Sequence, residues 1–173
     1  MAGLKLMTLL MPGCGIMTGA ELRTLRGALG LNIQNLADIR QVRRRTVEYW
    51  ESGKNKVPVD VAVFLNDLDI RLERAAVEWF TQVFSDPPEN KKILLLRYRE
   101  DADLWRFQPD FKPLPVTTHA VLLYRLRSKL EKQGIETAIH YLDVADYLQW
   151  LVGQGQEDSS AQRATWAALA LVQ

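Results

Sequence analysis

Four arginines lie within six residues of one another in the first third of the chain, and their side chains could bind an anion. Arg40, Arg43, Arg44 and Arg45 each carry a guanidinium that stays charged at neutral pH and can donate several hydrogen bonds to a phosphate or a base edge. Such a cluster repels itself until an anion binds. An ion pair of Arg44 with Glu48, one helical turn later, would contribute only a few tenths of a kcal/mol. The residue types therefore indicate contact with nucleic acid.

The other reactive residues form no recognisable catalytic or metal-binding pattern. His119 and His140 lack a nearby cysteine or carboxylate pattern, so each is expected to be a packed or solvated histidine. The single cysteine, Cys14, cannot form an internal disulfide, and it suits a reducing cytosol. The pair Ser159-Ser160 is better explained as a helix cap than as a nucleophile. We therefore expect no enzyme activity, no metal, no cofactor and a cytoplasmic location.

The charge is unevenly distributed along the chain. The 173 residues hold 22 Lys and Arg against 21 Asp and Glu, a formal net charge of +1. Residues 18–57 contain eight bases and four acids, whereas residues 58–84 contain two bases and five acids. A basic unit beside an acidic one indicates a polyanionic partner for one part of the chain only. No apolar run approaches the ~20 residues of a membrane span, so we expect no membrane partner.

Residues 1–17 contain a short apolar stretch after one lysine. We predict a disordered leader, or a start codon placed too early with Met17 as the true first residue. A secretory signal is the less favoured alternative, because the apolar core, residues 6–11, is shorter than such signals use.

Clear helical signals begin at Thr18. Thr18 and Asn32 can cap two successive helices, and Arg40-Gln41 makes a turn before a third helix that runs to about Ser52. The third helix is predicted to bury two residues, Val47 and Trp50, and to leave the opposite side polar, with Arg45, Glu48, Tyr49 and Ser52. The apolar residues of the first two helices are Leu22, Leu25 and Leu29, then Ile33, Leu36 and Ile39.

The next predicted helix is long. Pro58 suits its first position, and an apolar series can keep it helical to Phe84, about 40 Å at 1.5 Å per residue. The apolar spacing alternates between three and four, close to that of a coiled-coil seam. We predict a dimer seam here, and the alternative is the core of one subunit. The residues assigned to this seam are Val61, Leu65, Leu68, Leu72 and Trp79.

Ser85 to Pro88 then breaks the chain, so we predict a DNA-binding domain at residues 18–84 and a second region at residues 85–173. This second region is predicted to be α+β, for dimerisation or effector sensing. Its expected strands cover residues 93–99 and 135–142, and its expected helices residues 103–107, 117–133, 144–152 and 160–172, with Thr117 or Thr118 as the cap of the second. The fold class is therefore mainly α, with an N-terminal helix-turn-helix bundle, a long connecting helix and a small α+β region.

Leu36 to Gly53 resembles the helix-turn-helix of phage repressors of the Cro and cI type, the Xre-like family. The matching pattern is Leu36-Ala37, Val42, Thr46-Val47 and Trp50-Glu51-Ser52-Gly53. The resemblance covers roughly residues 18–68. The ending Tyr49 to Lys54, a proline at 58 and the long following helix are most similar to YdiL-type regulators and to repressors encoded beside anti-CRISPR genes.

This resemblance implies a homodimeric repressor that binds an inverted repeat and in some relatives controls its own operon. It assigns base reading to Arg44, Arg45 and Tyr49, with Glu48 between them. It assigns phosphate contacts to Asn32, Arg43, Thr46, Ser52, Lys54 and Lys56. Many relatives have glycine in the turn, where this chain has Arg40-Gln41. A non-glycine residue at positive φ costs roughly 1 kcal/mol, so the turn could differ in shape.

Two other functions are compatible with these residues. One is an antitoxin whose C-terminal region neutralises a toxin while its helix-turn-helix represses the operon, and a toxin-like reading frame beside the gene would favour it. The other is an enzyme with an appended DNA-binding module, which the missing nucleophile and base pattern disfavours. A basic group in the second region is expected to be a solvated helix face, with RNA binding as the alternative: Arg125, Arg127, Lys129 and Lys132.

Overall fold

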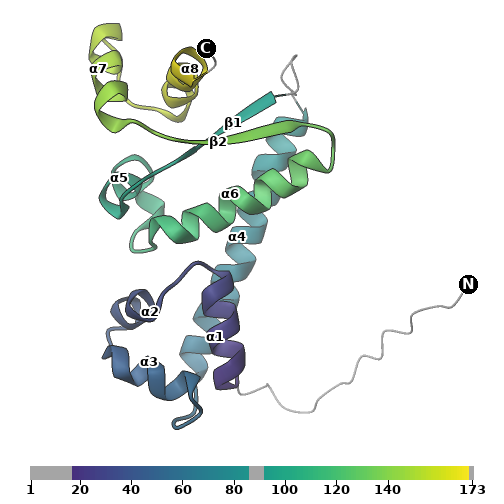
Figure 1. Ribbon diagram of the computed structural model, residues 1–173, viewed down its shortest axis with the longest axis vertical. Helices are drawn as coiled ribbons and strands as arrows, with labels where there is room; N and C mark the ends of the chain where they lie inside the picture. Colours follow the sequence, from purple (N-terminus) through teal and green to yellow (C-terminus); the bar gives the residue numbers. More distant parts are fainter. Residues whose placement is uncertain (1–16, 86–91, 172–173) are drawn as a thin grey trace, which may run out of the picture.

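The computed structural model describes residues 17–85 and 92–171 and shows a mainly helical chain (Figure 1). Three short helices, α1 (Gly19–Ala28), α2 (Ile33–Ile39) and α3 (Arg44–Glu51), pack around the first half of α4 (Val59–Ser85). The second half of α4 extends to the region that contains the sheet (Figure 1). The predicted fold class is confirmed. The predicted leader lies outside the described residues except for Met17, which packs against the N-terminal core.

The two predicted N-terminal caps are present. The hydroxyl of Thr18 accepts from the backbone N–H of Glu21, and the Glu21 carboxylate accepts from the backbone N–H of Thr18 at 2.7 Å. Hydrogen bonds donated to this carboxylate by the backbone N–H and the hydroxyl of Thr18 lower the pKa of Glu21. Asn32 and Asn35 make the same reciprocal pair at the start of α2. Capping satisfies backbone donors that the first helical turn leaves unpaired, so both starting points are set locally.

The turn between α2 and α3 has a left-handed residue that is not glycine. Gln41 has φ of 54°. Its N–H donates to the carbonyl of Asp38 at 3.1 Å, and the N–H of Val42 donates to that of Ala37 at 2.9 Å. This pair of bonds is the Schellman arrangement that ends a helix and returns the chain toward the core. Gln41 therefore supplies the conformation that glycine provides in many relatives, at a cost of roughly 1 kcal/mol.

One face of α4 forms the centre of the N-terminal core. Val61, Leu65, Leu68 and Leu72 are at most 4% exposed, and they belong to one cluster with residues of α1, α2 and α3. Trp79 packs partly buried against this cluster and against the one beneath the sheet. The face predicted as a dimer seam is thus covered by the chain itself, which corrects that assignment in favour of its alternative. Apolar periodicity shows that a helix face is buried, but it does not show which surface buries it.

The second region is built around two parallel strands. β1 (Lys92–Arg97) pairs with β2 (Glu136–Tyr141), and Leu95 lies opposite Ile139. The connection between them contains α5 (Asp101–Phe107), the short 3₁₀ helix η1 (Pro109–Phe111) and α6 (Val116–Glu131). Parallel strands need such a long crossover. After β2 the chain continues into α7 (Val144–Gln154) and α8 (Ser160–Leu171).

Both faces of this small sheet are covered. On one face Leu95 packs with Leu123 and Leu126 of α6. On the other face Leu94 and Leu96 pack against the cluster that contains Trp166 of α8. Burial on both faces is typical of parallel strands and explains the continuous apolar run of β1.

Helix α6 connects the second region to the first. Its residue Leu122 belongs to the N-terminal core, and Arg125 donates to the carboxylate of Asp69 on α4 at 2.5 Å. Lys129 pairs with Glu73 at 2.6 Å. Arg125 and Lys129 were predicted to lie on a solvated face, and they instead join two helices. The domain boundary near residue 85 stays a prediction.

The predicted caps of α6 have another role. The helix begins at Val116, after Pro115, so neither threonine is its cap. The Thr118 hydroxyl donates to the carbonyl of Leu29 at 2.8 Å, and the Thr117 hydroxyl donates to that of Gly30. The backbones approach closely here, because a Cβ on Gly30 would lie 2.4 Å from the carbonyl oxygen of Thr117. These contacts hold the start of α6 against the end of α1.

His119 is a buried histidine in this part of α6. It is 1% exposed and lies between the rings of Tyr98 and Phe111, at centroid distances of 5.4 and 5.1 Å. Neither ring nitrogen has a hydrogen-bond partner among the described residues. Burial, together with the charge of Arg97, lowers the pKa of His119 to about 4.

This burial predicts an acid-sensitive fold. In the unfolded chain His119 takes up a proton near pH 6.5, whereas in the folded protein it stays neutral down to about pH 4. The unfolded state therefore binds more protons between these values, and the free energy of unfolding should fall by about 3 kcal/mol as the pH drops from 6.5 to 4. Denaturant unfolding at several pH values measures this loss. In the variant His119→Leu this part of the pH dependence should disappear, and an unchanged dependence would contradict the assignment.

Candidate nucleic-acid interface

Helix α3 has one buried side and one exposed side. Val47 is 0% exposed and Trp50 is 6% exposed, and both pack in the N-terminal core as predicted. The exposed side carries Arg44, Arg45 and Glu48. An amphipathic helix that turns a basic, polar side outward has the dimensions and chemistry to enter a B-DNA major groove, which is about 12 Å wide.

Tyr49 brings two cations together on this side of α3. The Nε of Arg45 donates to the Tyr49 hydroxyl at 2.6 Å, and its guanidinium lies 5.3 Å from the centre of the ring. The ammonium of Lys54, in the loop after α3, lies 4.2 Å from the same centre. Cation–π attraction favours both placements. The tyrosine therefore holds Arg45 and Lys54 close together beside α3.

The remaining arginines of the cluster have different surroundings. Arg44 pairs with Glu48 at 3.0 Å, but both side chains are exposed, so the pair contributes little and can be exchanged for a ligand. Arg40 pairs with Asp60 of α4 and lies over the ring of Phe64, so it serves the fold. Within the described chain no salt bridge involves Arg43 or Arg45. Two of the four guanidinium charges thus remain without an acidic partner.

The residues assigned to phosphate contact lie around α3. Asn32 is exposed at the start of α2, and it lines a hollow of about 380 Å³ together with Arg26 and Arg44. Arg43 immediately precedes α3, and the Arg43 side chain makes no cap hydrogen bond. Three of the other assigned residues, Ser52, Lys54 and Lys56, are exposed at the end of α3 and in the following loop, and Thr46 is partly buried. The structure thus places these residues around one helix.

A largely buried ion pair joins α1 to the end of α3, and the sequence analysis did not predict it. The Nε of Arg26 donates to Glu51 at 2.5 Å, and the two side chains are 11% and 8% exposed. Arg26 also donates to the carbonyl of Leu31 at 2.6 Å. At ~100° per residue, Arg26 falls about 40° from Leu22 and Glu51 about 40° from Val47. Both charges therefore lie on the inward faces of their helices, and this signal could have identified the pair.

Other kinds of site are not visible in the described residues. No group of three or more His, Cys, Asp or Glu side chains in residues 17–85 and 92–171 could hold a metal ion. Over the same ranges no helix combines the length and the apolar character needed to cross a membrane.

Two curated proteins are similar to part of the chain, and no family model matches it. A protein of Pyrococcus furiosus named as an HTH-type transcriptional regulatory protein is 34% identical over 80 residues, which cover 42% of this chain and 25% of the relative. The Aca2 repressor of Pectobacterium phage ZF40 is 41% identical over 59 residues, which cover 33% of this chain and 51% of the repressor. The chain thus spans about a quarter and about half of the lengths of these relatives. Part of it is thus similar to an HTH-type transcriptional regulator and to a repressor.

Proposed function

We propose that this protein is a sequence-specific DNA-binding transcriptional repressor that acts as a homodimer on an inverted-repeat operator. The exposed side of α3 carries the proposal, because among the described residues it combines Arg45, which has no acidic partner, with a tyrosine that holds it, on a helix anchored by Val47 and Trp50. The partial similarity to a transcriptional regulator and to a repressor supports it. Control of its own operon is the regulatory role that we expect.

In this proposal the side chains of α3 and of the loop that follows it divide between two tasks. Arg44 and Arg45 can each present two N–H donors to O6 and N7 of a guanine. Tyr49 fixes the direction of Arg45, and Glu48 either supports Arg44 or accepts from a cytosine amino group. Lys54 and Lys56 would meet the phosphate backbone at the edge of the groove, where they add affinity without sequence information.

The first test compares two neighbours of the same tyrosine. Arg45→Ala should weaken binding to a duplex selected from a random pool by about 1–3 kcal/mol, roughly 5- to 150-fold, and should affect a scrambled duplex much less. Lys54→Ala removes a cation from the same ring, and it should weaken both duplexes about equally. Fluorescence anisotropy titrations measure both. Equal losses on the two duplexes for Arg45→Ala would make this arginine a phosphate contact, and a pool that enriches no sequence would refute specific binding.

A further inference from the structure

Helix α4 carries a second row of apolar side chains, on the side away from the core. We name this row the outer stripe, and its members are between 44% and 69% exposed. They are separated by four, seven, seven and seven residues: Val59, Val63, Ile70, Val77 and Phe84. Seven residues are close to two helical turns, so these side chains follow one line along the helix. More than half of the large apolar side chains that the described chain exposes lie in this row.

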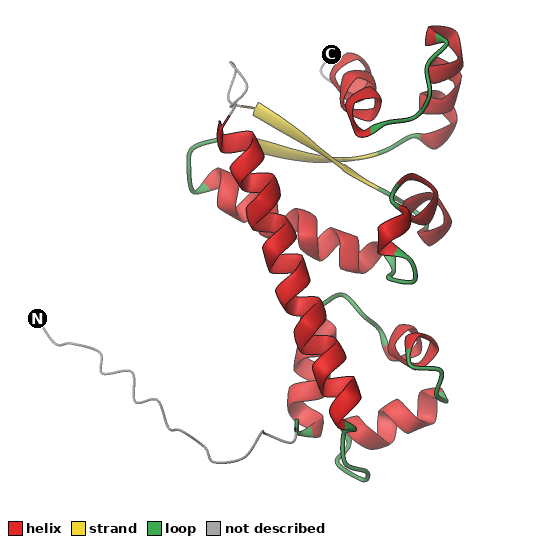
Figure 2. Cartoon of the chain, turned by 180° about the vertical axis from the view of Figure 1, so that it is seen from behind, coloured by secondary structure: helices red, strands yellow, loops and turns green. Residues whose placement is uncertain are grey.

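The chain covers the opposite face of α4 and leaves this one open. Figure 2 shows α4 crossing the near side of the molecule, and none of the drawn helices or strands passes in front of it. The inner residues Leu65, Leu68 and Leu72 are buried by the N-terminal bundle and α6. Apolar faces on both sides of one helix are expected when a second surface packs against the outer side.

We propose that the outer stripe is the surface on which a second copy of this chain packs, with the two α4 helices parallel. Val63, Ile70 and Val77 recur every seven residues, as do the a positions of a coiled coil. In parallel coiled coils, β-branched residues at a positions favour two helices over larger assemblies. The inference rests on the proposed function in one respect, because a dimeric repressor needs an interface and the inner face of α4 is already occupied.

Charges beside the stripe favour the parallel orientation. With Ile70 as an a position, Asp69 takes the preceding g position and Arg74 the following e position. In a parallel pair a g residue of one helix lies beside the e residue of the partner, so Asp69 would meet Arg74 with opposite charge. Asp69 accepts from Arg125 through one carboxylate oxygen and is 45% exposed, which leaves the other oxygen accessible. Antiparallel pairing would bring e residues beside e residues, so Asp69 and Arg74 would no longer meet.

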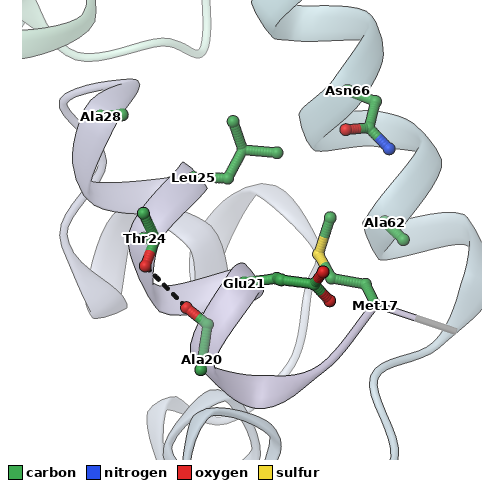
Figure 3. Close-up of a pocket in the computed structure, with 8 residues that line it drawn as sticks. All are labelled: Met17, Ala20, Glu21, Thr24, Leu25, Ala28, Ala62 and Asn66. Atoms are coloured by element: carbon green, nitrogen blue, oxygen red, sulfur yellow. Dashed lines mark hydrogen bonds between the residues drawn. The ribbon is translucent and has the colours of Figure 1, made fainter. Parts of the chain in front are cut away.

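The stripe supplies about half the area of a standard interface, and a groove adjoins it. The stripe is about 38 Å long at 1.5 Å per residue, and a strip about 10 Å wide offers on the order of 400 Å² per copy. A standard interface buries roughly 800 Å² per partner. A groove of about 610 Å³ between α1 and α4 adjoins the stripe, and Leu25, Ala62 and Asn66 line it (Figure 3). Because Asn66 lies three residues after Val63 on the same helix, a partner on the stripe would border this groove.

The parallel arrangement has a direct geometrical consequence for DNA. A twofold axis along α4 leaves both α3 helices at the same end of the dimer, since α3 lies beside the start of α4 (Figure 1). Two recognition helices at one end can occupy successive major grooves, about 34 Å apart. An antiparallel pair would place them at opposite ends.

The test compares the same substitution, valine to glutamate, at two exposed positions. Val77 lies in the stripe, and Val152 is an exposed valine of α7. Val77→Glu places two like charges at the proposed contact and should raise the dimer dissociation constant about 100-fold or more, with an unchanged helical signal. Val152→Glu should leave that constant unchanged. Sedimentation equilibrium of the full chain measures both, and a dimeric Val77→Glu or a monomeric wild type would overturn the inference.

Cross-linking tests the orientation separately. In a Cys14→Ser background, Ile70→Cys should form a disulfide between copies under mild oxidation, because a parallel pair places residue 70 beside itself within bonding range. Val152→Cys is the control and should not cross-link. Failure of Ile70→Cys to cross-link would overturn the parallel pairing. A DNA titration of the wild type distinguishes failure of this interface from failure of the proposed function. Specific binding by a monomer would refute the interface alone, whereas the absence of DNA binding would refute the proposed function.

Discussion

Glu51→Ala should lower the free energy of unfolding by about 3–5 kcal/mol, although Glu51 touches no ligand in the proposed complex. The substitution leaves the guanidinium of Arg26 buried without its carboxylate partner, and only the carbonyl of Leu31 still accepts from it. An unpaired buried charge loses its hydration without compensation. Because Glu51 ends α3 and Arg26 lies in α1, the loss should also loosen the attachment of the recognition helix. Urea unfolding followed by circular dichroism measures the change.

Two further variants serve as controls for this prediction. Glu48→Ala removes an exposed carboxylate from the same helix and should cost less than about 1 kcal/mol. The double variant Arg26→Met with Glu51→Leu removes both charges and should recover most of the stability, since apolar replacements of a buried pair are often neutral. A loss below 1 kcal/mol for Glu51→Ala would show that water solvates the pair and would reject its structural role.

DNA affinity should depend steeply on salt. If the proposed dimer neutralises about eight phosphates, log K falls with log salt at a slope near −7, because binding releases condensed counterions. Affinity would then decrease by about four decades between 50 and 200 mM salt. Anisotropy titrations across this range, on the selected and the scrambled duplex, measure the slope.

Single lysines provide the matched variants for this slope. Lys54→Ala removes one phosphate contact from each subunit, so the slope should become less steep by about 2 in a dimer. An exposed lysine of the second region, Lys132, offers the control, and Lys132→Ala should leave the slope unchanged. A flat salt response of the wild type would exclude nucleic acid as the principal partner.

Local signals in the sequence predicted the N-terminal bundle well. The caps at Thr18 and Asn32 depend on hydrogen bonds within one helical turn, and they are visible from residue types three positions apart. The inward side of α3 follows from the spacing of Val47 and Trp50. The turn at Arg40-Gln41 was predictable from the sequence. That a residue other than glycine adopts the left-handed conformation at position 41 depends on the surrounding fold.

Features that depend on distant contacts could not be predicted in this way. The spacing of Leu65 and Leu68 indicated a buried face of α4, but the partner surface comes partly from α6, more than 40 residues later. Thr117 and Thr118 have the residue type of a cap, and their hydroxyls instead donate to carbonyls of residues 29 and 30. Tertiary packing decides which partner each of these residues finds, and local residue preferences do not predict that partner.

Under the proposed function, the packing of α6 into the N-terminal core would couple DNA binding to folding. Leu122 belongs to the same core as Val47 and Trp50, so opening the sheet region also removes support from α3. A substitution there would change apparent operator affinity through the fraction of molecules that are competent to bind, with no change in the contacts to DNA. Conversely, any molecule that binds only the folded second region would raise this fraction. Under the proposed function, the second region would thus influence repression through the population of the folded state.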